Sequence, residues 1–205
     1  SVTDAGGTYQ FTNVPPGSYI VQETDLPGWL STADASGTND NRIAVTLVGG
    51  QDETGLFFLD TQPGSIAGSV LEDANGDGVF DAGEVGGING VTVALQTTNG
   101  VTLATTVTAG GGTYLFTAVA PGQYRVAETN LPGWLSTADT SGANDDRVAV
   151  TLTSGQASTG NDFLDLTYAA ISGSVLIDVD GGGDIDIEDT NGVSGVTVHL
   201  LDAGS

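Results

Sequence analysis

An acidic segment at residues 73–84 carries the side chains best suited to chemistry, and it reads Asp-Ala-Asn-Gly-Asp-Gly-Val-Phe-Asp-Ala-Gly-Glu. Counted from Asp73, side-chain oxygens fall at positions 1, 3, 5, 9 and 12, a glycine at position 6, and a usable backbone carbonyl at position 7. A hard cation takes six to eight oxygens at about 2.3–2.6 Å, and this is the spacing of the twelve-residue calcium loop. We therefore predict a Ca²⁺ site whose ligands are Asp73, Asn75, Asp77, the carbonyl of Val79, Asp81 and Glu84.

A second version of this loop follows at residues 178–189, with an altered set of oxygens. Position 5 has lost its carboxylate, position 7 has gained one, and position 12 is the shorter aspartate. We expect calcium here too, at a weaker site with one ligand exchanged for water. The predicted ligands are Asp178, Asp180, Asp184, Asp186 and Asp189. The competing interpretation of such segments is a solvated turn, because Asp, Asn and Gly are common turn formers. Four clustered carboxylates without a cation would repel one another, which argues against it at residues 73–84.

A further acidic cluster follows each of the two tryptophans. One copy contains Asp34, Asn39, Asp40 and Asn41; the other contains Asp139, Asn144, Asp145 and Asp146; Asp60 and Asp165 recur after the last strand. Their spacing matches no defined loop. A further calcium site and a polar turn paired with Arg42 or Arg147 are equally compatible with it.

An internal repeat organises the chain. The segment LPGWLSTAD occupies residues 26–34 and again, identically, residues 131–139, an offset of 105. Repetition at a fixed period indicates stacked structural units. We expect the later part of one repeat at residues 1–62, a complete calcium-binding repeat at 63–167, and the early part of a following repeat at 168–205.

Period-two alternation within the complete repeat predicts about seven short strands and no helix. We place them around residues 66–70, 91–96, 101–108, 113–117, 123–128, 147–152 and near Phe163. This number of strands in about 100 residues is typical of an immunoglobulin-like sandwich. The predicted fold class is all-β, with tandem Ig-like β-sandwich repeats of about 105 residues.

Composition excludes several classes of function. The chain has 26 acidic residues and 3 arginines, no lysine, and a formal charge of −23, which argues against nucleic-acid and anionic-membrane partners. It contains no cysteine and one histidine, His199, so disulfides, thiolate metal sites and multi-histidine sites are excluded. No apolar run is long enough to span a membrane. Without a phosphate-binding loop or nucleophile elbow, an enzyme is not expected and no catalytic residue is assigned. The composition favours an extracellular β protein.

The pattern GSVLEDANGDGVFDAGEVGGINGVTVAL, followed by GGTYLFTAVAPGQYRVAETNLPGW, resembles the B-repeat domains of serine-aspartate-repeat surface proteins, within the collagen-adhesin B-type modules. The resemblance implies a calcium-bound, Ig-like stalk unit of bacterial surface proteins, with more than one calcium per repeat. Many B-type modules carry a Lys–Asn isopeptide bond promoted by a buried acid, and Glu23 and Glu128 match that acid. Without lysine this crosslink cannot form, and we expect both glutamates to hydrogen-bond locally near the sandwich edge.

The favoured function is a calcium-stabilised structural repeat of an extracellular surface stalk or fibre. Its partners are neighbouring copies, bound head-to-tail as residues 168–205 of one chain complete residues 1–62 of the next, or adjacent repeats in a longer chain. The alternative is a ligand- or carbohydrate-binding adhesin module that uses Trp29 and Trp134. We expect these two rings to cover one end of the sandwich instead.

Overall fold

The computed structural model describes residues 1–84 and 86–201, and these form strands, turns and irregular segments. By their internal contacts the residues divide into two units, Ser1–Thr167 and Tyr168–Ser205. Within the described ranges, no helix has the length and apolar character needed to cross a membrane.

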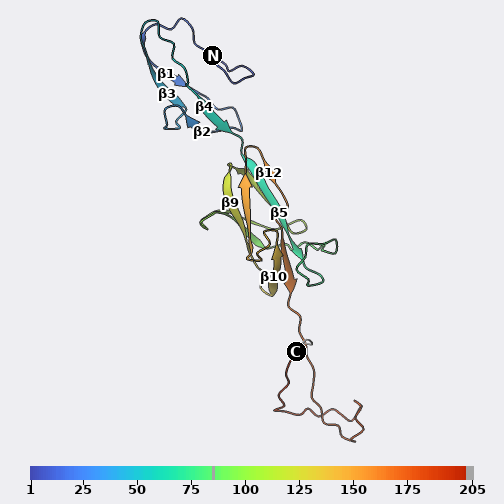
Figure 1. Cartoon of the computed structure of the whole chain (residues 1–205). Helices are drawn as coiled ribbons and strands as arrows, with labels where there is room; N and C mark the ends of the chain where they lie inside the picture. Colours follow the sequence, from blue (N-terminus) through green and yellow to red (C-terminus); the bar gives the residue numbers. More distant parts are fainter. Residues whose placement is uncertain (85, 202–205) are drawn as a thin grey trace. The chain divides into compact units, whose positions relative to one another are not determined.

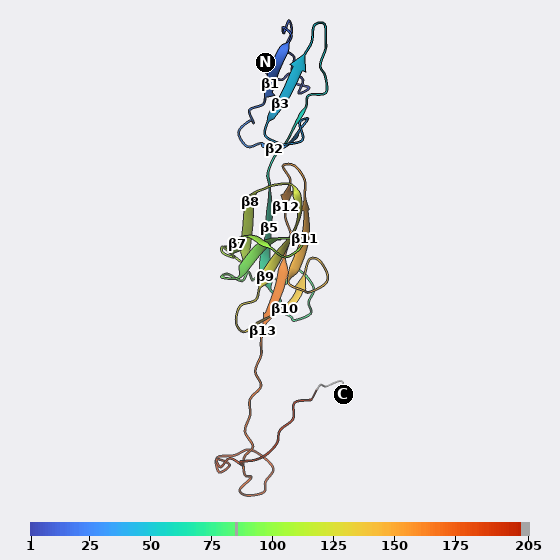
Figure 2. The same ribbon diagram turned by 90° about the vertical axis from the view of Figure 1, so that its left-hand side faces the viewer.

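Residues 64–167 form a sandwich of two sheets, seen as two layers in Figures 1 and 2. In the first sheet the order is β11 (Arg147–Leu152), β9 (Gly122–Thr129), β6 (Thr92–Thr97) and β7 (Thr102–Val107), with every neighbouring pair antiparallel. In the second the order is β10 (Trp134–Asp139), β13 (Phe163–Thr167), β5 (Gly64–Glu72) and β12 (Ala157–Ser158), and β8 (Thr113–Val119) also pairs with β5. The predicted all-β, Ig-like sandwich is confirmed.

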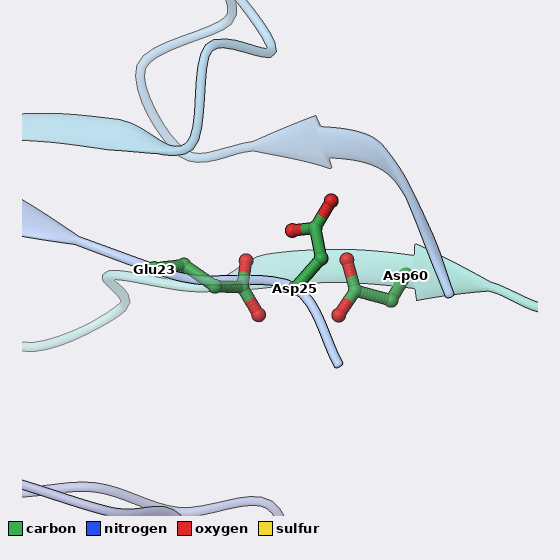
Figure 3. Close-up of side chains that lie close together, drawn as sticks. All are labelled: Glu23, Asp25 and Asp60. Atoms are coloured by element: carbon green, nitrogen blue, oxygen red, sulfur yellow. The ribbon is translucent and has the colours of Figure 1, made fainter. Parts of the chain in front are cut away.

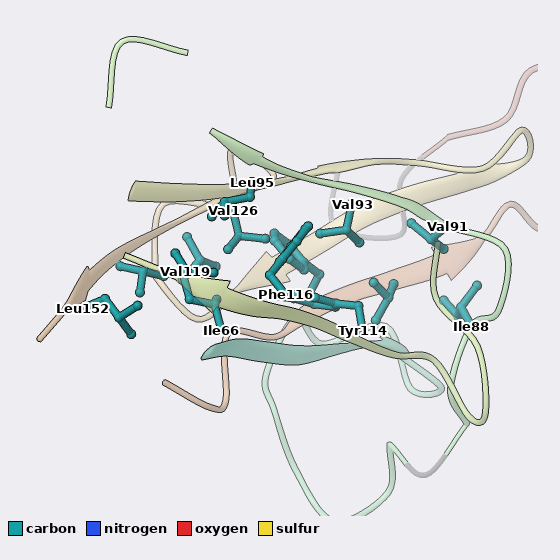
Figure 4. Close-up of a cluster of buried hydrophobic side chains, with 14 residues drawn as sticks. Ile66, Ile88, Val91, Val93, Leu95, Tyr114, Phe116, Val119, Val126 and Leu152 are labelled. Atoms are coloured by element: carbon teal, nitrogen blue, oxygen red, sulfur yellow. The ribbon is translucent and has the colours of Figure 1, made fainter. Parts of the chain in front are cut away.

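Alternation along the strands places one apolar face of each sheet in the core (Figure 4). In β8, Tyr114 and Phe116 are buried with ring centroids 5.9 Å apart in an edge-to-face arrangement, while Leu115 between them is exposed. The fully buried apolar side chains of this core cluster are Ile66, Val70, Val91, Val93, Val126, Leu152 and Phe163. Each contributes about 1.5–3 kcal/mol relative to an exposed position, so this cluster holds the two sheets together.

The strand prediction succeeds where alternation is regular and misses β10 and β12. β10 begins at Trp134, and its pairing with β13 shifts register between Ser136 and Ala138. A bulge breaks the period of two, which is why alternation does not reveal this strand. β12 has only two residues, too few to show a period.

The N-terminal residues form two separate strand pairs. β1 (Gly17–Gln22) pairs antiparallel with β3 (Arg42–Leu47), and β2 (Leu30–Asp34) pairs antiparallel with β4 (Phe58–Thr61). At the offset of 105 these four strands correspond to β9, β11, β10 and β13. They therefore repeat part of each sheet, without the counterparts of β5 and β6.

The second unit contains little regular structure within residues 168–201. Its one β-bridge joins Leu176 to Gly192, the counterpart of the Leu71–Gly87 bridge in the complete repeat. The segments that correspond to β5 and β6 are not paired as strands here.

Candidate metal centre

The loop at residues 73–84 is folded by hydrogen bonds to its own carboxylates. It begins where β5 ends, and the N–H of Asp73 donates to the carbonyl of Asp165 in β13 (2.8 Å). The N–H groups of Gly76 and Gly78 then donate to the two oxygens of Asp73, at 2.7 and 2.9 Å. Both glycines have positive φ, +75° and +68°, which lets the chain curl around the carboxylate.

This folding brings three carboxylates together. Asp73, Asp77 and Glu84 each place one oxygen within 4.8 Å of the others; Asp73 and Glu84 are buried and Asp77 is exposed. One Glu84 oxygen accepts the N–H of Asp81 at 2.7 Å, and the other, Oε1, is buried with no hydrogen-bond partner. A buried carboxylate oxygen without a partner, on a residue grouped with two other carboxylates, fits a site for a hard cation.

The ionisation state of Asp73 also suits a cation. Burial acts to raise the pKa of Asp73, but hydrogen bonds from the Thr137 side chain and from the N–H groups of Gly78 and Gly76 outweigh it. The pKa of Asp73 therefore lies below its ordinary value, and the carboxylate stays charged at neutral pH.

The remaining predicted ligands are placed differently. Asn75 lies against the group, since its amide donates to Asp77 at 2.9 Å. Val79 contributes its N–H to Asp77 at 2.9 Å and has an exposed side chain. Asp81 lies outside the group of three, and its Oδ1 accepts the N–H of Gly83 at 2.6 Å.

The second loop repeats the same hydrogen-bond framework. Gly181 and Gly183 donate to the two oxygens of Asp178 at 2.7 and 3.0 Å, and Asp186 donates to Asp189 at 3.2 Å. Among the described residues, however, no three carboxylates of this loop converge within 4.8 Å; Asp180 and Asp184 stay outside any such group. The altered spacing thus gives a similar turn with a more open set of oxygens.

The acidic cluster after Trp134 is largely a polar turn. Asp139 is buried and accepts hydrogen bonds from the N–H of Ser141 (2.8 Å), from its hydroxyl, and from the N–H of Asp145 (3.0 Å). Asp145 also forms an ion pair with Arg147 at 3.6 Å, with both side chains about half exposed. These contacts account for Asp139 and Asp145. Asp146 differs from them, because its Oδ1 is buried without a hydrogen-bond partner.

The expectation for Glu128 is wrong. Instead of hydrogen-bonding at the sandwich edge, Glu128 is 7% exposed and lies with Asp165, which is 0% exposed; none of their four oxygens accepts a hydrogen bond from a described donor. Burial first, and then the charge of Asp165, raise the pKa of Glu128 to about 9, and burial raises the pKa of Asp165 as well. In the alternation of β9 and β13, Glu128 and Asp165 fall on the faces that point into the sandwich. Their charge led to the expectation of an edge position, because Asp and Glu are almost never fully buried unless they are paired.

The N-terminal residues hold a related group. Figure 3 shows Glu23, Asp25 and Asp60, whose nearest oxygens lie within 4.8 Å of one another. Burial, with the charges of Asp60 and Asp25, raises the pKa of Glu23 to about 7. These residues correspond to Glu128, Asn130 and Asp165.

The two tryptophans differ in their surroundings. Trp134 is partly buried and packs against the core cluster, as predicted for a ring that covers the sandwich end. Trp29, its counterpart in the N-terminal residues, is 36% exposed.

Comparison with known proteins identifies relatives of this fold. Residues 64–163 match the family model described as the SdrD B-like domain. "Serine-aspartate repeat-containing protein D" of Staphylococcus aureus strain Newman is 34% identical over 213 residues, which cover 98% of this chain and 16% of the relative. "Serine-aspartate repeat-containing protein F" of Staphylococcus epidermidis is 32% identical over 224 residues, 98% of this chain and 13% of that protein. The chain thus spans a small part of the length of these relatives.

Solved structures with similarity include pilins. The major pilin subunit BcpA of Bacillus cereus has a TM-score of 0.40 at 15% identity over 64% of this chain and 36% of the pilin. The major pilin SpaD of Corynebacterium diphtheriae has a TM-score of 0.36 at 19% identity over 52% of this chain and 32% of the pilin. The family match and the identity along the chain agree with the resemblance seen in the sequence, and the complete repeat belongs to the SdrD B-like domain family.

Proposed function

We propose that the chain is a calcium-stabilised structural repeat of an extracellular bacterial surface stalk or fibre. Its family places it at the cell surface. The observation that carries the calcium assignment is the convergence of Asp73, Asp77 and Glu84 within 4.8 Å, with Glu84 Oε1 buried and unpartnered. When bound, Ca²⁺ supplies the positive charge that these carboxylates lack, and the loop's own hydrogen bonds orient the oxygens before it arrives.

Calcium at this loop is expected to stabilise the pairing of β5 with β13 within the second sheet. The loop connects the end of β5 to the bridge at Gly87, and Asp73 is bonded to β13 through Asp165. For a site with Kd of about 10⁻⁴ M, millimolar calcium adds RT ln(1 + 10), about 1.4 kcal/mol. That gain is expected to resist separation of β5 from β13 in a loaded stalk.

We further propose that residues 1–62 and residues 168–205 are complementary parts of one sandwich, completed by a neighbouring copy or by an adjacent repeat. Phe163 in β13 is fully buried in the core cluster of the complete repeat, whereas its counterpart Phe58 in β4 is only half-buried. The added exposure of Phe58 is expected where the counterparts of β5 and β6 are missing, because β5 and β6 supply Ile66, Val70 and Val93 to the cluster that contains Phe163.

The C-terminal residues expose apolar side chains whose counterparts are buried in the complete repeat. Ile66 and Val93 are 0% exposed in the complete repeat, and their counterparts Ile171 and Val198 are 81% and 75% exposed. These are the apolar residues that β5 and β6 supply to the core. Residues 1–62 therefore lack the apolar side chains that residues 168–205 expose. This relation favours strand complementation between copies.

Association of the full chain in calcium tests this assembly. Analytical ultracentrifugation should show concentration-dependent, head-to-tail oligomers, and Val198→Asp should reduce them because it buries a charge in the completed core. Thr197→Asp is the matched control, since its counterpart Thr92 is exposed. A chain that stays monomeric at every concentration, or equal loss in both variants, contradicts complementation by a second copy.

The adhesin alternative has less support. Trp134 packs against the core, so it offers no free ring for stacking on a sugar. Trp29 is more exposed, but it belongs to the face that complementation would cover. We therefore assign the aromatic residues to packing and propose no catalytic role for the carboxylates.

A further inference from the structure

The sandwich has an open side between β7 in the first sheet and β8 in the second. Among the described strands, β7 pairs only with β6 and β8 only with β5, so both are edge strands. They lie next to each other without pairing (Figure 2). An edge strand presents a row of N–H and C=O groups that can pair with a further strand. The open side is therefore a place where another chain can add a strand.

This open side carries no charge, in a chain that is otherwise strongly acidic. Residues 85–124, which include β6, β7 and β8, contain none of the 26 acidic residues and none of the 3 arginines. The other edge of the first sheet differs, because β11 begins at Arg147 and directly follows Asp145 and Asp146. Natural proteins use such charges to keep edge strands from pairing with other chains. β11 has this protection and β7 lacks it.

Apolar side chains line the open side. Leu103 and Val107 of β7 and Leu115 of β8 are each more than half exposed. Leu103 and Leu115 border a hollow of about 390 Å³ together with the buried Phe116. Val107 and Leu115 border a second hollow of about 490 Å³. An uncharged strand with apolar side chains is the partner that fits this surface, since it buries these residues without desolvating a charge.

A second copy of the chain supplies such a strand. Two copies that each carry a formal charge of −23 repel each other, and the repulsion is weakest where the facing surfaces are uncharged. β7 itself, with the sequence Thr-Leu-Ala-Thr-Thr-Val, is uncharged and rich in the β-branched residues that favour strands. Contact between the same patch on two copies gives a closed dimer with two-fold symmetry.

The backbone of β7 shows which of its groups are free to pair. The N–H of Thr108 donates to the carbonyl of Val91 at 2.9 Å, and the carbonyl of Thr108 accepts the N–H of Gly90 at 2.8 Å. Both backbone groups of Thr108 therefore point toward β6 and its flank. These directions alternate along an antiparallel strand, so the N–H and C=O of Thr105 and Val107 point to the open side. The pairing of β7 with β6 is regular over this stretch.

Symmetry then sets the register of the pair. Residues directly opposite each other in an antiparallel pair point to the same face, so the two-fold axis must pass through one residue rather than between two neighbours. Thr105 meets this condition, because its backbone groups point to the open side and it lies near the middle of β7. With Thr105 opposite Thr105, Val107 of one copy lies opposite Leu103 of the other. The exposed apolar side chains of each copy thus cover those of its mate.

We propose that two copies of the chain associate side by side through antiparallel pairing of their β7 strands, centred on Thr105. The two four-stranded first sheets then join into one continuous sheet. This lateral contact is distinct from the head-to-tail completion of residues 1–62 by residues 168–205. In a stalk it joins neighbouring chains rather than successive repeats, and it requires neither calcium nor that completion.

Disulfide trapping tests the register. The chain has no cysteine, so Thr105→Cys places a single thiol at the centre of the pair. Opposite residues of a hydrogen-bonded antiparallel pair have Cα atoms about 5.5 Å apart, within the range of a disulfide. Ala149→Cys is the matched control, because Ala149 is an exposed residue of β11 at the other edge of the same sheet. With oxidised glutathione, Thr105→Cys should give several-fold more disulfide-linked dimer than Ala149→Cys at the same concentration. Equal yields overturn the proposal.

Reversible association tests the contact without a crosslink. Thr105→Asp places like charges opposite each other and should weaken dimerisation several-fold, whereas Ala149→Asp adds the same charge at the other edge and should not. Both positions are exposed, so both variants are expected to fold. Sedimentation measures both in the full chain carrying Val198→Asp, in which head-to-tail completion is weakened.

The outcomes separate the lateral contact from the head-to-tail assembly. If Val198→Asp alone has no effect while Thr105→Asp reduces association, the head-to-tail assembly is wrong and the lateral contact is supported. Equal association of the Thr105→Asp and Ala149→Asp chains overturns the lateral contact. If a strand of a different protein occupies the edge instead, the isolated chain forms no dimer through β7, and this result also overturns the proposal.

Discussion

Asp73 and Glu84 are the first and last residues of the twelve-residue loop, and the fold buries both beside Asp77, with one oxygen of each within 4.8 Å of the others. A segment of twelve residues at the end of β5 is thereby closed so that three of its carboxylates form one group. Like charges at this separation repel unless a cation lies among them, so the sandwich and the ion are expected to stabilise each other.

Substitutions in the loop should show how much each predicted ligand contributes to the stabilisation by calcium. Glu84→Gln should remove most of the calcium-dependent stabilisation at this loop, about 1 kcal/mol in millimolar calcium, because Glu84 is buried within the convergent group. Asp81→Asn should have a smaller effect, since Asp81 lies outside it. Calcium titrations followed by calorimetry measure both. Equal effects would show that the cation draws Asp81 inward on binding, contrary to this geometry.

Replacement of the equivalent residues Leu164 and Leu59 by alanine should show, by the change in stability, which of the two sandwiches is complete. Leu164→Ala removes a fully buried side chain and should cost about 2–5 kcal/mol in chemical denaturation. Leu59→Ala, at the exposed counterpart, should change the stability of the monomer by less than about 0.5 kcal/mol and weaken association of copies. A large loss of monomer stability in Leu59→Ala would mean that β4 is already covered without a second copy.

Two equivalent glycines, Gly68 and Gly173, also test which repeat is complete, because an added methyl group is tolerated only where the position is not yet packed. A Cβ at Gly68 would lie 2.0 Å from the carbonyl oxygen of Asn161, so Gly68→Ala should destabilise the complete repeat by about 1–3 kcal/mol or more. Gly173 occupies the corresponding place in the second unit and has no atom within 4 Å of such a Cβ. Gly173→Ala should leave the monomer unchanged and reduce association if that segment enters a neighbouring sandwich.

The outcome is measured by denaturation and sedimentation on the same samples. Association of Gly173→Ala at wild-type strength would contradict the proposed insertion of residues 168–205 as β5 and β6 counterparts.

The calcium-free chain should lose stability as the pH rises. Burial and the charges of Asp165, Asp146 and Asp139 raise the pKa of Glu128 to about 9, above its ordinary value of 4.5. Between these values the folded chain holds more protons than the unfolded chain, so the free energy of unfolding falls from about pH 4.5 to about pH 9. Thermal unfolding in chelator measures it, and Glu128→Gln should flatten the slope. A slope that is the same in both would exclude Glu128 as its source.

The sequence predicted the sandwich well because period-two alternation follows from burial of one face of each strand. The convergence of Asp73, Asp77 and Glu84 could be predicted because the spacing within the loop is local. The sequence misplaced Glu128, whose environment depends on Asp165 from the opposite sheet, a contact between distant segments. Alternation did not reveal β10 for a related reason. The register shift between Ser136 and Ala138 arises from the pairing of β10 with β13. Long-range pairing is the part that a local pattern does not encode.

Thermal unfolding of the full chain with millimolar calcium and with chelator tests the central claim most directly. The account predicts a higher Tm in calcium, by several degrees for each site that contributes about 1.4 kcal/mol, and a smaller difference in Glu84→Gln. A Tm that is the same in calcium and in chelator would contradict calcium as the stabilising ion of this repeat.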